Sequence, residues 1–225
     1  MFLTQGLYQY DIINLWQTFP TIKEVCRGKI RKRQPMRQRL LTLLCQQAYF
    51  RQLVTLSSGK QSNYYIDCRK VTLSAEGAYL TAKLILSALA GMGVQAVGGL
   101  TLGADPIAAA VAALSFVEGQ PLQGFLIRKE AKKHGRRRSI EGPELPPGTQ
   151  VAIVDDVATT GGSLITAIER VRQETDWQIA RVLCLVDRQE GAQAQVRQAG
   201  HELLALFTAQ ELADYWEKLS SGVRV

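Results

Sequence analysis

The chain has 225 residues, of which 46% are hydrophobic and 21% charged, and its formal net charge is +7. This composition is ordinary for a globular protein, and the length suffices for one well-buried domain with a small appendage. No run of about 18 apolar residues is free of charge or glycine, so the sequence predicts no membrane span and no membrane partner. The start also lacks a secretory pattern, because no basic segment precedes its apolar residues and Asp11 interrupts them.

Cysteine usage indicates the cellular compartment. The four cysteines are Cys26, Cys45, Cys68 and Cys184, and no two of them form a CxxC pair. A domain of this size does not need disulfides, so we expect reduced thiols in a cytoplasmic protein. Neither of the two histidines has metal-ligand spacing relative to the cysteines, and we assign no residue as a direct metal ligand.

The basic charge is concentrated at the N-terminus. Residues 1–35 hold six lysines and arginines against two acids, so they supply +4 of the net charge of +7. The high isoelectric point is therefore weak evidence for nucleic-acid binding, and we expect no nucleic-acid partner. We interpret residues 1–35 as an extension of unknown role. Met36 is one alternative for the true start, and a short extra helix packed on the surface is the other.

Periodicity predicts the elements in chain order. An amphipathic helix opens at Met36, a strand–turn–strand unit covers about 54–67, and a helix from Ser74 runs to about Met92. Strands then alternate with helices: strands at 94–102, 125–127, 151–154, 179–186 and 203–207, and helices at 107–117, 163–174, 192–199 and 209–219. This alternation predicts an α/β fold whose parallel sheet is covered on both faces, with ligands at the carboxyl ends of the strands.

The most informative segment is 151–163. A buried apolar strand ends at two acids, and a turn rich in threonine and glycine leads into a helix. The backbone N–H groups of such a turn suit a phosphate, while carboxylates accept hydrogen bonds from ribose hydroxyls. The segment thus predicts a cradle for a ribose 5-phosphate, against the alternative of an ordinary strand–turn–helix corner with acidic caps. Its residues are Asp155, Asp156, Val157, Ala158, Thr159, Thr160, Gly161, Gly162 and Ser163.

This string resembles the binding signature for phosphoribosyl pyrophosphate (PRPP) in type I phosphoribosyltransferases. The resemblance implies chemistry that displaces pyrophosphate from C1 of ribose. It also implies the family's fold, a central parallel sheet flanked by helices with a small N-terminal hood. We therefore expect a phosphoribosyltransferase domain over 36–225, with the hood at about 36–74 and the core at about 75–225.

A second motif is the basic run from Arg128 to Gly135, which continues into three arginines. Taken alone, a charge run is usually a solvated loop. This one resembles the catalytic loop of orotate phosphoribosyltransferases, R-K-x-x-K-x-H-G. The resemblance implies that Arg128, Lys129, Lys132 and His134 handle PRPP, the last three as catalytic residues. It further implies a homodimer with shared active sites, because the family's loop reaches into the neighbouring subunit.

A third motif, Asp187 to Glu190, places Arg188 at the end of a buried strand. An arginine there forms a rim salt bridge in many proteins, but the sequence D-R-Q-E also resembles the orotate family, where this arginine meets the base. We expect Arg188 and Thr159 to bind orotate, an anionic pyrimidine that suits a guanidinium. Tyr64 or Tyr65 in the hood either stacks on orotate or belongs to the core.

Together the motifs resemble those of an orotate phosphoribosyltransferase, an enzyme that forms orotidine 5'-monophosphate and pyrophosphate from PRPP and orotate in pyrimidine biosynthesis, with Mg²⁺ as cofactor. The alternatives are a type I phosphoribosyltransferase for another base, or an RNA-binding regulator on the same fold. Two lysines common in the family are missing: Ser57 occupies one position, and the loop 99–106 has no lysine. We assign those two roles to no residue.

Overall fold

The computed structural model describes residues 35–55, 61–129 and 139–222. These residues belong to one compact unit, Pro35–Val225. The predicted N-terminal extension, the hood turn at Ser57 and the centre of the basic loop, with Lys132 and His134, lie outside the described residues. Within the described ranges, no helix is both long and apolar enough to cross a bilayer.

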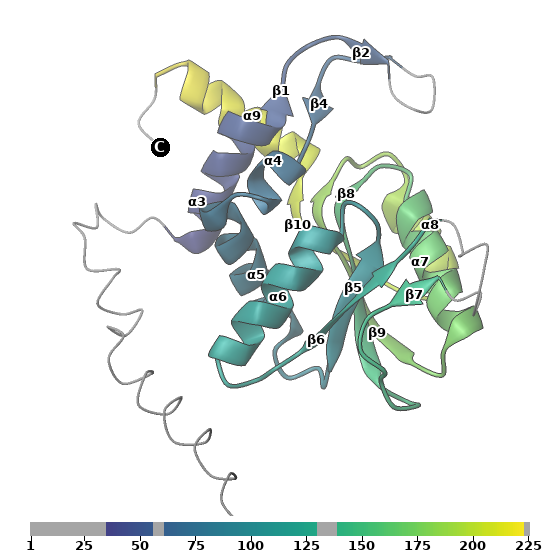
Figure 1. Ribbon diagram of the computed structural model, residues 1–225. Coiled ribbons are helices and arrows are strands. Elements are labelled where there is room, and N and C mark those ends of the chain that lie inside the picture. The colour runs from purple at the N-terminus through teal and green to yellow at the C-terminus, as the bar shows by residue number, and fades with distance from the viewer. Residues whose placement is uncertain (1–34, 56–60, 130–138, 223–225) are drawn as a thin grey trace, which may run out of the picture. The chain divides into compact units, whose positions relative to one another are not determined.

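A six-stranded sheet forms the centre of the fold (Figure 1), in the order β10-β9-β8-β5-β6-β7. Its strands are β5 Ala96–Leu100, β6 Gln123–Ile127, β7 Ile140–Glu141, β8 Gln150–Ala158, β9 Gln178–Asp187 and β10 Leu203–Thr208. All neighbouring strands are parallel except β7, which pairs antiparallel with β6. The predicted parallel α/β sheet is confirmed, and only the short edge strand β7 was not predicted.

Helices cover both faces of this sheet, as the alternation of elements predicted (Figure 1). They are α5 Ala75–Leu89, α6 Asp105–Val117, α7 Gly162–Glu174, α8 Ala192–Gln198 and α9 Ala209–Ser220. Strand β8 shows how the two layers divide: Ala152 and Val154 pack with α5 and α6. Val151 and Ile153 pack with α7 and α8. Successive strand residues point to opposite faces, so an all-apolar strand is what a doubly covered sheet requires.

Helix ends follow local chemistry. The Ser74 side chain accepts a hydrogen bond from the Gly77 backbone N–H at 3.1 Å, which caps α5 as the sequence predicted. Pro106 lies in the first turn of α6, where its missing N–H costs nothing. Helix α5 ends at Leu89 rather than near Met92, because Gly91 and Gly93 adopt positive φ angles of 75° and 69°.

The segment before α5 contains four short strands, more than the predicted strand–turn–strand unit. Its elements are α3 Met36–Leu43, the π-helical turn η1 Leu44–Ala48, β1 Tyr49–Phe50, β2 Val54–Thr55, β3 Gln61–Ser62, β4 Tyr65–Ile66 and α4 Arg69–Thr72. Strand β2 pairs with β3, and β4 pairs with β1. The two predicted β-type runs are present as β2 and β4, whereas β1 and β3, with which they pair, were not predicted. The two pairs are separate two-stranded antiparallel sheets along one arm of the chain, and we call this arm the ribbon (Figure 1).

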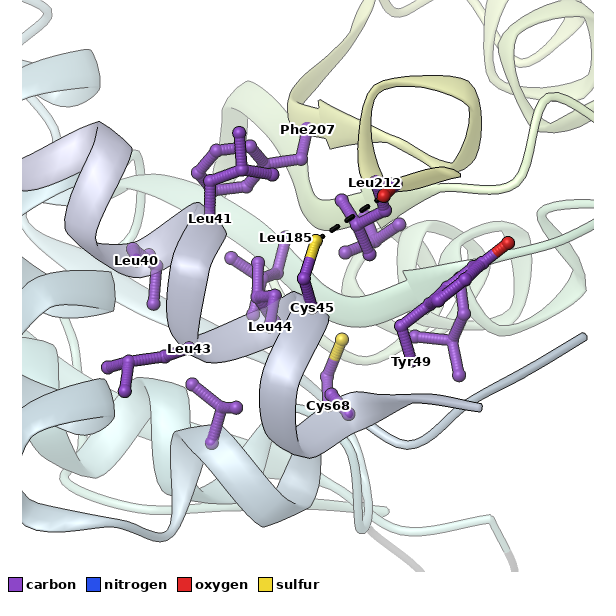
Figure 2. Close-up of a cluster of buried hydrophobic side chains, with 14 of the residues drawn as sticks. Leu40, Leu41, Leu43, Leu44, Cys45, Tyr49, Cys68, Leu185, Phe207 and Leu212 are labelled. Carbon is purple, nitrogen blue, oxygen red and sulfur yellow. Dashed lines mark hydrogen bonds between the residues drawn. The ribbon is translucent and has the colours of Figure 1, made fainter. Parts of the chain in front are cut away.

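Helix α3 and the turn η1, which precede the ribbon, pack against the C-terminal helix α9. Figure 2 shows the apolar side chains of α3 and η1 packed against Leu185, Phe207 and Leu212. The Cys45 thiol donates to the Leu212 carbonyl at 3.4 Å, and the hydroxyls of Thr42 and Tyr215 lie 2.9 Å apart. The three described cysteines, Cys45, Cys68 and Cys184, are buried free thiols. Burial raises the pKa of Cys45 to about 12, so this thiol stays protonated.

Candidate active site

An open cleft of about 420 Å³ lies at the carboxyl ends of β5, β8 and β9, where the fold class predicted ligands. Several parts of the chain line it: the ribbon and α4, the loop after β5, the start of the basic loop after β6, the ends of β8 and β9, and the first turn of α7. The lining residues are Val54, Tyr65, Ile66, Asp67, Arg69, Leu100, Thr101, Leu102, Gly103, Lys129, Asp155, Asp156, Val157, Thr159, Ser163 and Arg188. Segments far apart in the sequence thus meet at one edge of the sheet.

The two acids lie inside β8 rather than after it. The strand was predicted to end at Val154, but it runs to Ala158 and keeps pairing with β9, with Asp155 opposite Cys184 and Ala158 opposite Asp187. Each carboxylate accepts a neighbouring backbone N–H: Asp155 Oδ1 from Asp156 at 3.0 Å, and Asp156 Oδ1 from Val157 at 2.9 Å. A rigid strand therefore fixes both acids.

Burial makes this pair electrostatically unfavourable as two free carboxylates. Asp155 is 7% exposed, and desolvation followed by the charge of Asp156 raises its pKa well above the usual range. Desolvation also raises the pKa of Asp156, although the Val157 N–H and the charge of Arg69 act in the opposite direction. A ligand that brings hydroxyl donors or a cation to the two acids relieves this cost.

The turn after β8 leads directly into α7. Gly161 has a φ of 91° and lies close to Ala192, where a Cβ would be 3.1 Å from the Cα of Ala192. Among the described residues no side chain caps the N-terminus of α7, so its first N–H groups remain available to an anion. Of the predicted cradle, five residues line the cleft: Asp155, Asp156, Val157, Thr159 and Ser163. Thr160 in the turn and Gly162 at the start of α7 are exposed beside it, whereas Ala158 and Gly161 are buried.

The loop between β5 and α6 closes the opposite wall. A Cβ on Gly103 would collide with the Asp156 carboxylate, so only glycine lets this loop approach the acids. Asp105 begins α6, and its Oδ1 atom is buried without a hydrogen-bond partner among the described residues. Desolvation raises the pKa of Asp105. The close approach of this loop to Asp156 was not predicted from the sequence.

At the other end of the cleft, Arg188 is held by three contacts. It is 6% exposed; its Nε donates to Glu190 at 2.8 Å, and one terminal nitrogen donates to Ser62 at 3.2 Å. Its guanidinium lies 4.6 Å from the ring centroid of Tyr64, which stacks on Tyr49 at 5.5 Å. Tyr64 is therefore a packing partner of Arg188. Tyr65 is the tyrosine that lines the cleft.

The start of the basic loop lies beside the site. Lys129 lines the cleft, and its charge opposes the rise in the pKa of Asp155. Arg128 is not among the lining residues; its backbone N–H donates to Ser139, and its guanidinium lies 3.6 Å from Glu141. Lys132 and His134 lie outside the described residues. Asp67 and Arg69, in contrast, line the cleft although the sequence had not marked them as site residues.

A parallel sheet whose central strand carries one buried and one partly buried acid, and leads through a glycine turn into an uncapped helix, is typical of a type I phosphoribosyltransferase. No protein-family model matches the sequence. The chain is 49% identical over 180 residues to orotate phosphoribosyltransferase of Thermosynechococcus vestitus. The matched region covers 80% of this chain and 94% of that protein. The chain belongs to the orotate phosphoribosyltransferase family.

Solved structures agree with this assignment. The orotate phosphoribosyltransferase of Mycobacterium tuberculosis H37Rv in complex with Fe(III) dicitrate matches with a TM-score of 0.70 and 36% identity, covering 79% of this chain and 99% of that one. The same enzyme in complex with PRPP matches with a TM-score of 0.67 and 34% identity, covering 80% and 99%. The fold predicted from the sequence, that of a type I phosphoribosyltransferase, is confirmed.

Proposed function

We propose that this protein transfers the ribose 5-phosphate of PRPP to orotate, giving orotidine 5'-monophosphate and pyrophosphate. The observation that carries the proposal is the order of groups along one cleft. The uncapped N-terminus of α7 supplies N–H groups for the 5-phosphate. The acids of β8 face the ribose hydroxyls, and Arg188 offers a guanidinium to the orotate carboxylate. Thr159 lines the same cleft, and we propose that it also contacts orotate.

The reaction needs no nucleophile from the protein. The bond from C1 to the pyrophosphate oxygen breaks and its electron pair leaves with pyrophosphate, while the orotate nitrogen forms the new bond to C1. Positive charge develops on the ribose and negative charge on the leaving group. The acids in β8 hold the ribose still during this change, and their rigid strand keeps the reacting atoms aligned.

The basic loop serves the leaving group in this proposal. Lys129 lines the cleft, and Arg128 lies next to it in the chain. With Lys132 and His134 of the same loop, they neutralise charge on the departing pyrophosphate, an effect typically worth on the order of 3 kcal/mol for one well-placed donor. Lys132 or His134 also protonates the departing oxygen. Closure of such a loop excludes water from an activated ribose.

Magnesium is the proposed cofactor. The described residues contain no group of three or more histidine, cysteine or acidic side chains that gathers as a metal site. We propose that the ion enters with PRPP, where Asp155 and Asp156 would be the carboxylates that face it. Their raised pKa values favour this arrangement, because a cation offsets the cost of two neighbouring, largely desolvated charges. When bound, Mg²⁺ offsets charge on the leaving group.

A homodimer with shared active sites is part of the proposal. Leu73 and Leu102 are 72% and 67% exposed and line a hollow of about 740 Å³ beside the cleft, together with Pro106. Exposed apolar surface next to an active site is typical of a protein interface. In such a dimer the basic loop of one subunit serves the cleft of the other. We also propose that the protein is cytoplasmic. Its proposed parts are the hood at residues 36–74, the core at 75–225 and an appended segment at 1–35.

The direct test is the loss of orotate absorbance with PRPP and Mg²⁺, with hypoxanthine and uracil as controls. Turnover of orotate alone supports the proposal. Turnover of another base with no turnover of orotate contradicts it and favours the first alternative from the sequence. An inactive protein that binds RNA favours the regulator.

A further inference from the structure

The pyrophosphate end of the cleft lacks an obvious cation on its own loop. The loop 99–106 contains neither lysine nor arginine. Three cationic side chains line the cleft among the described residues: Arg69, Lys129 and Arg188. Arg188 donates hydrogen bonds to Ser62 and Glu190, and it lies at the end of the cleft where we propose that orotate binds. Arg69, the first residue of α4, is the one without a role in the mechanism above.

Arg69 is held by one side of its guanidinium. Its Nε donates to Asp67 Oδ1 at 2.8 Å, and its backbone N–H donates to the same oxygen at 3.3 Å. Asp67 is itself fixed, because its backbone N–H donates to the Ala48 carbonyl at 2.9 Å. Neither terminal nitrogen of Arg69 has a hydrogen-bond partner within the described part of the chain, and the side chain is 45% exposed. The guanidinium is thus oriented, and its outer edge remains available.

The position of Arg69 defines which part of a ligand it meets. Arg69 lines both the cleft and the neighbouring apolar hollow, as Leu102 does, whereas no residue of the 155–163 cradle lines that hollow. The charge of Arg69 acts to lower the pKa of Asp156, and Asp156 is the acid against which Gly103 packs. Arg69 therefore lies on the side of the cleft formed by the 101–103 loop and Asp156.

We propose that Arg69 binds the diphosphate group of PRPP and the pyrophosphate product, and that Asp67 is the positioning residue that orients it. An arginine whose Nε is anchored presents two terminal N–H groups to phosphate oxygens, a geometry that an ammonium cannot match. The loop 101–103 then contributes backbone groups, and Arg69 supplies the charge that this loop lacks. The inference rests on the proposed function for the orientation of PRPP in the cleft.

The test is calorimetric binding of inorganic pyrophosphate and of ribose 5-phosphate, each with Mg²⁺, to the full chain. Arg69→Gln should weaken pyrophosphate binding about 10–100-fold, the range for one lost charged hydrogen-bonding group. Ribose 5-phosphate should bind within about twofold of the wild-type value, because the cradle is untouched. Asp67→Asn should cause a smaller loss of the same kind, since the arginine keeps its charge but loses its ionic anchor.

Lys70→Gln is the matched control. Lys70 is the next residue of the same short helix and its loss changes the charge equally, but its Nζ lies 4.3 Å from the centroid of the Phe50 ring and it does not line the cleft. This variant should bind both ligands like the wild type. Arg69→Lys separates charge from geometry, and it should recover only part of the pyrophosphate affinity. Unchanged thermal melting of each variant shows that binding, rather than folding, is measured.

Two results overturn the inference. One is pyrophosphate affinity in Arg69→Gln within about twofold of the wild type. The other is an equal loss of ribose 5-phosphate and pyrophosphate affinity, which would place Arg69 at the cradle instead. The proposed function fails separately: a wild-type protein that binds pyrophosphate through Arg69 but does not turn over orotate contradicts that function and leaves the arginine's role intact.

Discussion

Replacing both acids of β8 by asparagine should separate stability from binding. Asp155 is buried, and desolvation is the main cause that raises its pKa well above the usual range. Desolvation is also the main cause that raises the pKa of Asp156. A carboxyl whose folded-state pKa is raised binds protons more readily when folded than when unfolded. Ionisation therefore costs stability as the pH rises above the unfolded value of about 3.9. Asparagine cannot ionise, so the double variant should escape this cost.

The thermal midpoint of Asp155→Asn, Asp156→Asn should accordingly equal or exceed that of the wild type at neutral pH. Each 1 kcal/mol gained corresponds to roughly 2–4 °C for a domain of this size. The advantage should shrink as the pH falls through about 4, because the wild-type acids become protonated in both states below this value. Calorimetric melting of the unliganded proteins between pH 4 and 8 measures this difference.

Binding of PRPP should change in the opposite direction. Two charged acceptors facing the ribose hydroxyls are lost, each worth about 1.5–3 kcal/mol, so affinity should fall by about 10²-fold or more. Isothermal titration with PRPP and Mg²⁺ gives the dissociation constant. A double variant that melts lower than the wild type at pH 7, or one that binds PRPP equally well, would refute the reasoning from burial to ligand binding.

Three further outcomes follow from the proposed active site. Arg188→Ala should raise the orotate KM at least about tenfold, because a buried guanidinium oriented by Ser62 and Glu190 is lost, while the PRPP KM changes little; unchanged orotate kinetics would contradict its role. Lys132→Ala should lower kcat far more than it alters orotate affinity, and a defect confined to the orotate KM would count against a role at the leaving group. Mixing inactive Lys132→Ala subunits with inactive Asp155→Asn, Asp156→Asn subunits should restore roughly a quarter of wild-type activity, because half of the dimers are mixed and each has one intact site. No recovery after confirmed subunit exchange would mean that each loop serves its own chain.

The alternating part of the fold was predictable because its pattern is local. An apolar run such as Val151 to Val154 has few alternatives to a strand covered on both faces, and Ser74 marks a helix start through its own side chain. The end of β8 was missed because two adjacent acids resemble the end of a buried strand. Pairing with β9 extends the strand past them to Ala158.

The ribbon and Arg69 were harder to predict for a different reason. Strands of two residues carry almost no periodic signal, so the pairing of β1 with β4 depends on tertiary packing. Arg69 forms a contact with Asp67 only two residues away, but its meeting with Leu102 and Asp156 in one cleft depends on how distant segments pack. Lys132 and His134 remain predictions from the resemblance alone.

The packing of α3 and η1 on α9 has a consequence for biosynthesis. Thr42 and Tyr215 are 173 residues apart in the chain, and Cys45 reaches a carbonyl of the same helix. During translation, α3 therefore emerges long before α9. Until then, Leu40 and Leu44 lack the residues of α9 that belong to the same buried cluster, such as Leu212 (Figure 2). The contacts of Thr42 and Cys45 with this helix can form only after Ala209–Ser220 has left the ribosome. A nascent chain halted before that point leaves part of the apolar surface of α3 and η1 uncovered.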